Sequence, residues 1–378
     1  MTLATVQRWI ARAKDLPIDQ VNWSDESHAP EAPPKKTPAE IERMILEIRQ
    51  ELMTSSILGE RGALAVREHL LLLKPDATET IPSTATINRI LKRHGVFDGR
   101  VRVRRPPPPA GWHLPDVSAM KTELDQFDGV EGLFLEGGEE VYVLNAVSLH
   151  GGLVGSWTTS SITSEFTCKT LVTHWRENGL PGYVQFDNGL AFTGPRHYRN
   201  AIGTVIRLSL SLGVTPVFVP PREFGFQANI ESYNNLWQQK VWQRTAFESA
   251  SEVEIHSKRY VAASRKKRVV RIEGSPIRHP FPSDWVDPTD WTKPLPINRA
   301  GKIIFLRRSD GNGDMEVLVN SHHVSDHWPN RLVRCEIDIA NDKIQFYGLR
   351  RQAPTVQNLL KEVEFHLPEQ GSKVGKEE

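Results

Sequence analysis

Apolar residues recur at helical spacing in three segments near the start of the chain. The sequence Thr37–Glu40 (TPAE) is typical of a helix start, with Thr37 as the cap, and a stripe of Ile41, Met44, Ile45 and Ile48 follows it. A second helix is predicted over Glu60–Leu73. A third begins after Ser83, buries Ile87, Ile90 and Leu91, and stops at Gly95. This order predicts an all-α domain of the helix-turn-helix type over residues 37–98.

The outer face of the third predicted helix is polar and basic. Hydroxyls, amides and basic groups are the side chains that reach phosphates and base edges in a DNA major groove. Here they are Thr84, Thr86, Asn88, Arg89, Lys92 and Arg93. A three-helix bundle with a solvated polar face would show the same pattern, so both interpretations stay open.

An earlier helix is predicted over Leu3–Asp15. Val6 and Ile10 would be its buried residues, and Gln7, Arg8 and Arg12 its exposed ones. Residues 1–36 therefore form either the remnant of a second helix-turn-helix with a linker, or a separate helix that docks elsewhere.

Between residues 115 and 270 the pattern changes to strands alternating with amphipathic helices. The predicted strands lie within Lys121–Val130, Glu140–Leu149, Gly151–Thr159, Gly182–Phe186 and Val214–Pro220, and the predicted helices are Thr163–Gly179, Pro195–Gly213 and Gln227–Phe247. The order β-β-β-α-β-α-β-α predicts a mixed α/β sheet with helices on both faces.

The last third reads as short strands. Alternating runs between Asn298 and Tyr347 predict four or five strands in a small SH3-like β-barrel, assigned to residues 298–352. Proline-rich stretches mark linkers at 99–114 and 271–297, and residues 353–378 are expected to be a tail whose last ten residues are disordered.

Composition limits the class of protein. With 39% hydrophobic and 25% charged residues, the chain has the balance of a soluble globular protein, and no apolar run approaches the ~20 residues of a membrane span. The N-terminus lacks the apolar core of a secretory signal. Two cysteines, Cys168 and Cys335, exclude a disulfide framework and a Cys-rich zinc site, and they predict a cytoplasmic protein.

The net charge of +1 says nothing about nucleic acid, but the basic residues are clustered. Gly99–Arg105 contains four arginines and no acid, and Lys258–Arg278 contains eight basic residues. Such clusters can neutralise phosphates, or they can be solvated linkers. The candidate phosphate contacts are Arg102, Arg104, Arg105, Lys266, Lys267 and Arg268.

Three carboxylates in the central region are placed where chemistry could occur. Asp128 closes the first predicted strand, and Asp125, on the opposite face, is its rival. Asp187 ends the fourth strand, and Glu231 lies near the start of the last predicted helix. If strands one and four are adjacent, the two aspartates lie side by side and repel each other unless a cation sits between them. Oxygen ligands without cysteine suit Mg²⁺ or Mn²⁺. For each acid alone, an ordinary turn or surface role is the alternative.

The region Glu123–Trp242 resembles the catalytic core of DDE transposases and retroviral-type integrases. The similarity is carried by "ELDQFDG", by "LPGYVQFDNGLAF", and by "PPREFGFQANIESYNN", in which Pro221 lies ten residues before Glu231 and Asn234 three after it. The acids are 59 and 44 residues apart. The chain departs from the family pattern at Ala191, at Gln227–Ala228, and at Asn145, where an Asp is frequent.

This resemblance implies a ribonuclease H-like core in which Asp128, Asp187 and Glu231 bind two Mg²⁺ (or Mn²⁺) ions. Asn188, Gly189 and Asn234 would be auxiliary residues, although Asn188 and Gly189 could equally be turn residues. The flanking domains resemble those of bacterial insertion-sequence and Mu-type integrases.

The implied activity is nicking at element ends followed by strand transfer of the 3′-OH into target DNA. The implied partners are double-stranded DNA, further copies of the chain and an accessory ATPase, in the bacterial cytoplasm at the nucleoid. Two alternatives remain: a DNA-binding regulator or assembly factor with a vestigial core, and a ribonuclease H-like nuclease without strand transfer.

Overall fold

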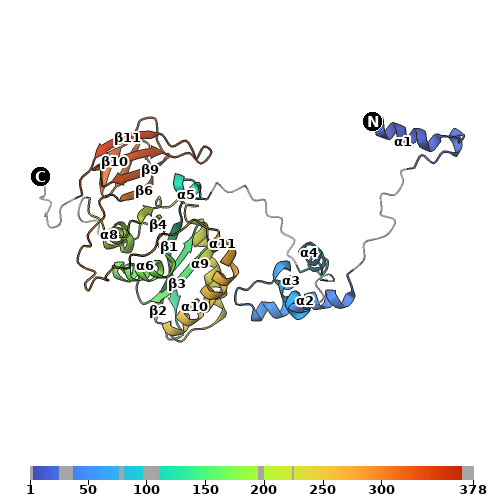
Figure 1. Cartoon of the computed structure of the whole chain (residues 1–378), viewed down its shortest axis with the longest axis horizontal. Coiled ribbons are helices and arrows are strands. Elements are labelled where there is room, and N and C mark those ends of the chain that lie inside the picture. Colours follow the sequence, from blue (N-terminus) through green and yellow to red (C-terminus); the bar gives the residue numbers. More distant parts are fainter. Residues whose placement is uncertain are drawn as a thin grey trace. The chain divides into compact units, whose positions relative to one another are not determined.

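The computed structural model describes residues 3–24, 37–75, 81–96, 110–194, 200–223 and 225–367 (Figure 1). The chain divides into two compact units, one of Met1–Leu52 with Arg61–Asp98 and one of Met53–Glu60 with Gly99–Glu378. Arg102, Arg104 and Arg105 lie outside the described residues, as do the last ten residues of the chain. No helix within the described ranges is both long enough and apolar enough to cross a membrane.

The first unit contains three helices around one small core. These are α2 (Ala39–Ser55), α3 (Ala63–Leu73) and α4 (Thr84–Arg93). Their buried residues include Ile45, Ile48, Val66, Leu70, Ile87 and Leu91. Ser83 caps α4 as predicted, since its side-chain oxygen accepts a hydrogen bond from the Thr86 N–H at 3.3 Å, and Gly95 follows the helix with a φ of +69°. α2 begins at Ala39, two residues after the predicted cap.

The N-terminal helix α1 (Leu3–Ala13) forms as predicted, but its apolar stripe is not buried. Val6 is 39% exposed and Ile10 is 64% exposed, so the expectation that they are core residues is wrong. A single short helix has no second layer of its own to cover such a stripe. The ring of Trp9 instead packs against Trp23, after the short helix η1 (Ile18–Gln20), with 5.5 Å between centroids.

The second unit is built on one nine-stranded sheet. Its strand order is β11-β10-β9-β6-β5-β4-β1-β2-β3. At one end of the sheet three strands pair antiparallel, namely β1 (Leu124–Phe134), β2 (Glu140–Ser148) and β3 (Val154–Thr159). β4 (Tyr183–Phe186) and β5 (Thr215–Phe218) continue the sheet in parallel to β1. The predicted mixed sheet is therefore confirmed.

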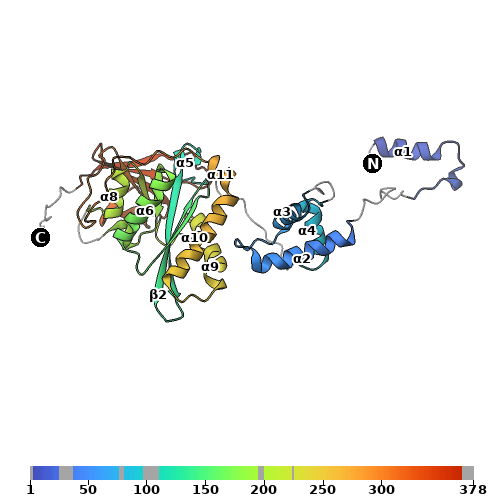
Figure 2. The same cartoon turned by 60° about the horizontal axis from the view of Figure 1, so that its bottom comes forward.

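Helices cover both faces of this sheet, as the sequence indicated (Figure 2). On one face lie α6 (Ser164–Asn178) and α8 (Thr204–Ser211), which share a buried cluster with Leu144 and Ala146 of β2. On the other lie α9 (Ala228–Lys240) and α10 (Ala250–Lys267), which share a second cluster with Val143 and Val147 of the same strand. Alternate residues of β2 thus face opposite layers. Shorter helices are α5 (Pro115–Ser118), α7 (Leu190–Thr193), η3 (Trp242–Arg244) and α11 (Val269–Glu273).

The predicted helix over Gln227–Phe247 is two elements. α9 ends at Lys240, a 3₁₀ turn follows, and α10 then begins after Ser249, whose side chain accepts a hydrogen bond from the Glu252 N–H at 3.3 Å. The sequence analysis did not predict α10, although Ser249 with Glu252 is a recognisable helix start.

The C-terminal strands do not form a separate barrel, which corrects the assignment of residues 298–352. β6 (Lys302–Arg308) pairs in parallel with β5, at Val217 with Ile304 and Phe218 with Phe305. Next along the sheet come β9 (Leu332–Asp338), β10 (Lys343–Gly348) and β11 (Leu359–Glu364), the last in the stretch expected to be a tail. β7 (Asp314–Val317) and β8 (Asn320–His323) form a separate hairpin.

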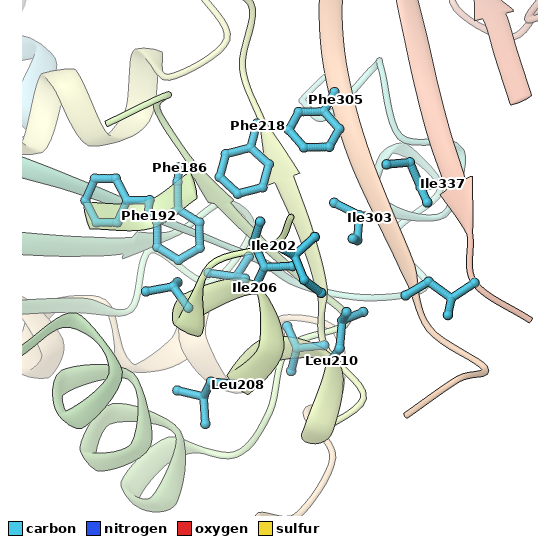
Figure 3. Close-up of a cluster of buried hydrophobic side chains, with 14 of the residues drawn as sticks. Phe186, Phe192, Ile202, Ile206, Leu208, Leu210, Phe218, Ile303, Phe305 and Ile337 are labelled. Atoms are coloured by element: carbon cyan, nitrogen blue, oxygen red, sulfur yellow. The ribbon is translucent and has the colours of Figure 1, made fainter. Parts of the chain in front are cut away.

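The two halves of the sheet share one apolar layer (Figure 3). Phe186 of β4, Phe218 of β5 and Phe305 of β6 lie in a row, with ring centroids 6.2 and 5.0 Å apart. The alternation of apolar and polar residues in β6 is the same whether the strand belongs to a separate barrel or pairs with the outer strand of an existing sheet. In this chain it covers the edge that β5 would otherwise expose.

The segment predicted to be a linker over 271–297 has little regular structure, but it packs on the second unit. Trp291 and Leu295 are buried in the layer that contains Phe305. The backbone of Leu180 pairs with that of His279. This stretch is therefore part of the folded unit and not a free spacer.

Candidate acidic active site

Asp128 lies on β1, and Asp187 is the residue that follows β4, its parallel neighbour. β1 and β4 pair at Leu124 with Tyr183, Asp125 with Val184, and Gln126 with Gln185. Asp128 and Asp187 have the same separation in sequence as each of these pairs, so they continue the same register. Both side chains are half-buried. The arrangement expected for adjacent strands one and four is thus present.

Two glutamines hold the chain that leads into α9. Gln126 and Gln185 each precede one of the two aspartates by two positions. Their side-chain Nε2 groups donate to the backbone oxygen of Phe226, at 3.1 and 2.9 Å respectively. Phe226 lies two residues before α9, so these bonds fix the start of that helix above β1 and β4.

Glu231 lies in the first turn of α9 and is exposed. Its helix is held against β1 and β2 by Ile230, Tyr233 and Trp237, which share a buried cluster with Val130 and Val143. Neighbours of Glu231 in sequence therefore fix the backbone, while the carboxylate itself stays at the surface.

Burial and two neighbouring acids act on the pKa of Asp128. Burial is the largest cause, and together with the negative charges of Asp187 and Glu231 it raises this pKa from 3.8 to about 7. Hydrogen bonds from the Gly129 N–H and the Asn234 amide act in the opposite direction. A carboxylate in this environment is stabilised either by a proton or by a cation.

The donor set fits a hard divalent cation, because carboxylate oxygens are the ligands that Mg²⁺ and Mn²⁺ prefer. In the part of the chain that the structure describes, no three acidic, histidine or cysteine side chains converge closely enough to hold an ion as they stand. Glu231 is the acid with room to move, since its exposed side chain can change rotamer at small cost.

The Asp-Asn-Gly sequence makes a turn and places Asp187 at the same time. The Gly189 N–H donates to Asp187 Oδ1 at 2.8 Å. The φ of Gly189 is −58°, so the position does not need left-handed backbone. A Cβ at Gly189 would lie 3.0 Å from Asp187 Oδ1, so glycine permits this close approach.

The side chain of Asn188 connects three strands. Its Nδ2 donates to the Val219 backbone oxygen at 2.7 Å, next to β5, and its Oδ1 accepts from Arg307 of β6 at 2.8 Å. Asn188 therefore ties the turn after β4 to the C-terminal half of the sheet. The turn role, one of the two left open for this residue, is the one these contacts support.

Asn145, one of the departures from the family pattern, is linked to Asp128 through Asn234. Asn234 Nδ2 donates to Asp128 Oδ2 at 2.8 Å, and Asn145 Nδ2 donates to Asn234 Oδ1 at 2.9 Å. Asn145 is fully buried on β2, directly opposite Asp128. A polar residue in the middle of an apolar strand was the available signal.

Asp125, the rival of Asp128, belongs to a different site. Its carboxylate is fully buried and forms an ion pair with Arg278, whose Nη1 lies 3.0 Å from Asp125 Oδ2. Trp175 Nε1 donates to the same oxygen at 3.2 Å, and His174 Nε2 lies 3.7 Å away. Asp125 thus anchors the 271–297 segment, on the opposite side of β1 from Asp128.

The candidate DNA-reading residues lie on the outer face of α4. Asn88, Arg89, Lys92 and Arg93 are exposed, and Thr84 and Thr86 are half-buried. Arg93 Nη2 forms an ion pair with Glu42 of α2 at 2.5 Å, so this arginine also links two helices of the unit.

The basic residues at the end of α10 divide into two groups. Lys266 and Lys267 are exposed, and Lys267 forms an ion pair with Glu60. Arg268 instead donates to the Gly152 backbone oxygen at 3.1 Å, and its neighbours Arg265 and Arg271 donate to Val154 and Leu149 at 2.8 and 2.9 Å. These three arginines hold the turn between β2 and β3.

No protein-family model and no curated protein matches the sequence. Among solved structures, the chain is similar to the catalytic core domain of BIV integrase, with 19% identity over 38% of this chain and 84% of that one, and a TM-score of 0.30. It is also similar to a simian T-cell lymphotropic virus intasome in complex with PP2A regulatory subunit B56 gamma, with 13% identity over 61% of this chain and 76% of that one, and a TM-score of 0.32. Similarities this distant carry no functional weight.

Proposed function

We propose that this chain is a DNA transposase or integrase of the DDE class, a polynucleotidyl transferase. The observation that carries the proposal is the level placement of Asp128 on β1 and Asp187 directly after its parallel neighbour β4, with the charge of Glu231 acting on Asp128. The sequence motifs around the three acids support the same activity.

In this proposal Asp128, Asp187 and Glu231 hold two Mg²⁺ or Mn²⁺ ions. When bound, such ions activate the attacking oxygen and stabilise the leaving oxygen in phosphoryl transfer. The chain's own contribution is to fix the acids: the Gly189 N–H holds one oxygen of Asp187, and Asn234 holds one oxygen of Asp128.

The proposed reaction has two steps. In the first, water attacks a phosphodiester at the element end and releases a 3′-OH. In the second, that 3′-OH attacks a phosphodiester of the target DNA, so one P–O bond forms as another breaks. No covalent protein–DNA intermediate is required.

DNA contacts are proposed for both units. The outer face of α4 would read the element end, and the exposed Lys266 and Lys267 would contact backbone phosphates. Arg102, Arg104 and Arg105 are proposed phosphate contacts as well. Because two DNA ends must be joined to one target, the active form would be a homo-oligomer on DNA in the bacterial cytoplasm, with an accessory ATPase as a further partner.

The test is a strand-transfer assay with Mg²⁺, in which the DNA ends are taken from the flanks of the gene. We expect wild type to join the ends to target DNA and Asp187→Asn to lose at least about a thousandfold in rate, since removal of one metal ligand removes most of the electrostatic stabilisation. Asp116→Asn is the matched control, because Asp116 is an exposed acid paired with Lys121 and should have no effect.

The same assay separates the alternatives. Because no three carboxylates of the described residues converge as they stand, a DNA-binding regulator with a vestigial core is the second candidate. DNA binding without metal-dependent chemistry in wild type would favour it. Cleavage without joining would favour a ribonuclease H-like nuclease.

A second prediction concerns end recognition. Arg89→Ala combined with Lys92→Ala should abolish sequence-specific binding of the element end, since both side chains are on the exposed face of α4. The measurement is a gel-shift titration against specific and scrambled duplexes. Arg43→Ala is the control, because Arg43 is an exposed arginine on α2 paired with Glu47. Unchanged specificity in the double variant would contradict this role of α4.

A further inference from the structure

Asn145 is a polar amide within an apolar stretch of β2. It lies in β2 between Leu144 and Ala146, and all three residues are buried. In the antiparallel pairing of β1 with β2 it is the direct partner of Asp128. Burying an amide is unfavourable unless it is hydrogen-bonded, so its bonds show what it is used for.

The hydrogen bonds of Asn145 run in one direction, toward Asp128. When Asp128 holds a cation its carboxylate is ionised and can only accept hydrogen bonds, so Asn234 turns its NH₂ group to Asp128 and its oxygen to Asn145. Asn145 must then offer its own NH₂ group to Asn234. The two bonds are 2.8 and 2.9 Å long.

This orientation leaves a hydrogen-bonding group of Asn145 unused. Its Oδ1 is buried and has no hydrogen-bond partner among the described residues. A buried amide whose oxygen accepts no hydrogen bond is a poor choice for stability, since an unsatisfied buried acceptor is destabilising. Its presence is explained by its effect on Asn234.

We infer that Asn145 is a positioning residue for the acidic site, which acts by fixing the amide of Asn234 and, through it, the rotation of the Asp128 carboxylate. The inference rests on the proposed function, because it assumes that Asp128 holds a cation. It adds a residue whose side chain bonds to Asn234 and not to an acid. Outer partners of this kind typically change metal affinity about 10–100-fold when they are removed.

The structure supplies a matched control for a merely structural role. Tyr233, the residue before Asn234 in α9, bonds through its hydroxyl to Ser156 of β3 at 2.8 Å, and both residues are buried. Ser156 is the β3 partner of Asn145. Tyr233→Phe therefore removes a buried bond between the same helix and the same sheet, but one that leads to no acid.

The experiment is a Mn²⁺ titration of the full-length protein, followed by electron paramagnetic resonance. We expect Asn145→Leu to bind Mn²⁺ about tenfold more weakly than wild type, and Tyr233→Phe to bind it as wild type does. Thermal unfolding is measured for each variant, and Asn145→Ala is made in parallel in case leucine does not fit.

The outcomes distinguish this inference from the proposed function. If wild type and Asp187→Asn both fail to bind Mn²⁺, the metal site and the inference fall together. If wild type binds and Asn145→Leu binds equally well, the positioning role alone is overturned.

A double-substitution cycle tests the route of action. If Asn145 acts through Asn234, Asn145→Leu combined with Asn234→Leu should bind Mn²⁺ no more weakly than Asn234→Leu alone. If the double variant loses Mn²⁺ affinity by the product of the two single losses, the two residues act independently, and the proposed action of Asn145 through Asn234 is overturned.

Discussion

At the residue scale, Asp128 combines burial with two nearby negative charges. These raise its pKa to about 7, so the folded protein holds a proton that the unfolded chain, with a pKa of 3.8, has already released. The folded state is therefore favoured by this residue at low pH and loses that advantage as pH rises from about 4 to about 7. The full difference is of the order of a few kcal/mol.

We accordingly expect metal-free Asp128→Asn to gain stability relative to wild type between pH 4 and 7, with no further gain above that range. The measurement is chemical unfolding of both proteins across this pH range, without metal. Mg²⁺ added at pH 8 should stabilise wild type and leave the variant unchanged. A difference between the two proteins that is constant with pH would refute the raised pKa.

Single residues differ in how far they could be predicted from sequence. The position of Asp187 was predictable, because a strand that ends in Asp-Asn-Gly places its acid at the carboxyl end of that strand whatever the rest of the chain does. Asn145 was not, because its role depends on lying opposite Asp128 in the β1–β2 register and below Asn234 on α9. The choice between Asp125 and Asp128 likewise needed the location of Arg278, 153 positions from Asp125.

At the scale of elements, two Arg–Asp pairs involve the irregular 271–297 segment. Arg278 reaches from it to the fully buried Asp125, while Asp287 within it pairs with Arg176 at 2.8 Å on the surface. Removing one partner of a buried pair leaves a charge without compensation, whereas exposed pairs contribute little.

Arg278→Met should therefore lower the free energy of unfolding by about 3–5 kcal/mol, and Arg176→Met by no more than about 1 kcal/mol. Guanidinium unfolding of both variants against wild type is the measurement. Similar effects for the two substitutions would show that the segment is not anchored through Asp125.

Most helices and strands were predictable because each has a characteristic hydrophobic period in its own sequence, and the helices also have capping residues. β6, β9 and β10 were also predicted as strands, but with the wrong partners, and β11 lies in the stretch expected to be a tail. Which strand pairs with which depends on residues far apart in the sequence. The alternation of apolar and polar residues in β6 does not indicate that β6 pairs with β5. α10 was missed because its apolar positions are sparse among charged residues, although its cap was visible.

At the scale of the whole molecule, the C-terminal half of the sheet completes the unit that bears the acidic residues. A chain ending at residue 297 would lose β6 and expose the edge and side chains of β5, including Phe218. We expect it to show no cooperative unfolding transition and to be digested rapidly by protease, because it loses part of the buried clusters that the two halves of the sheet share.

Truncation after Leu367 is the control, since the residues removed lie beyond β11. A cooperative transition in the shorter chain would show that residues 298–352 are dispensable for the fold, as expected of a separate barrel.

The pairing of β5 with β6 also sets when this protein can finish folding. Phe305 is 87 positions later in the chain than its partner Phe218. During synthesis, the apolar edge of β5 must therefore wait unpaired until β6 has emerged from the ribosome, and closure over so long a separation is slow. A nascent chain that already carries all three acids is at that stage an incomplete sheet open to aggregation, so the yield of folded protein should depend on chaperones that bind during translation.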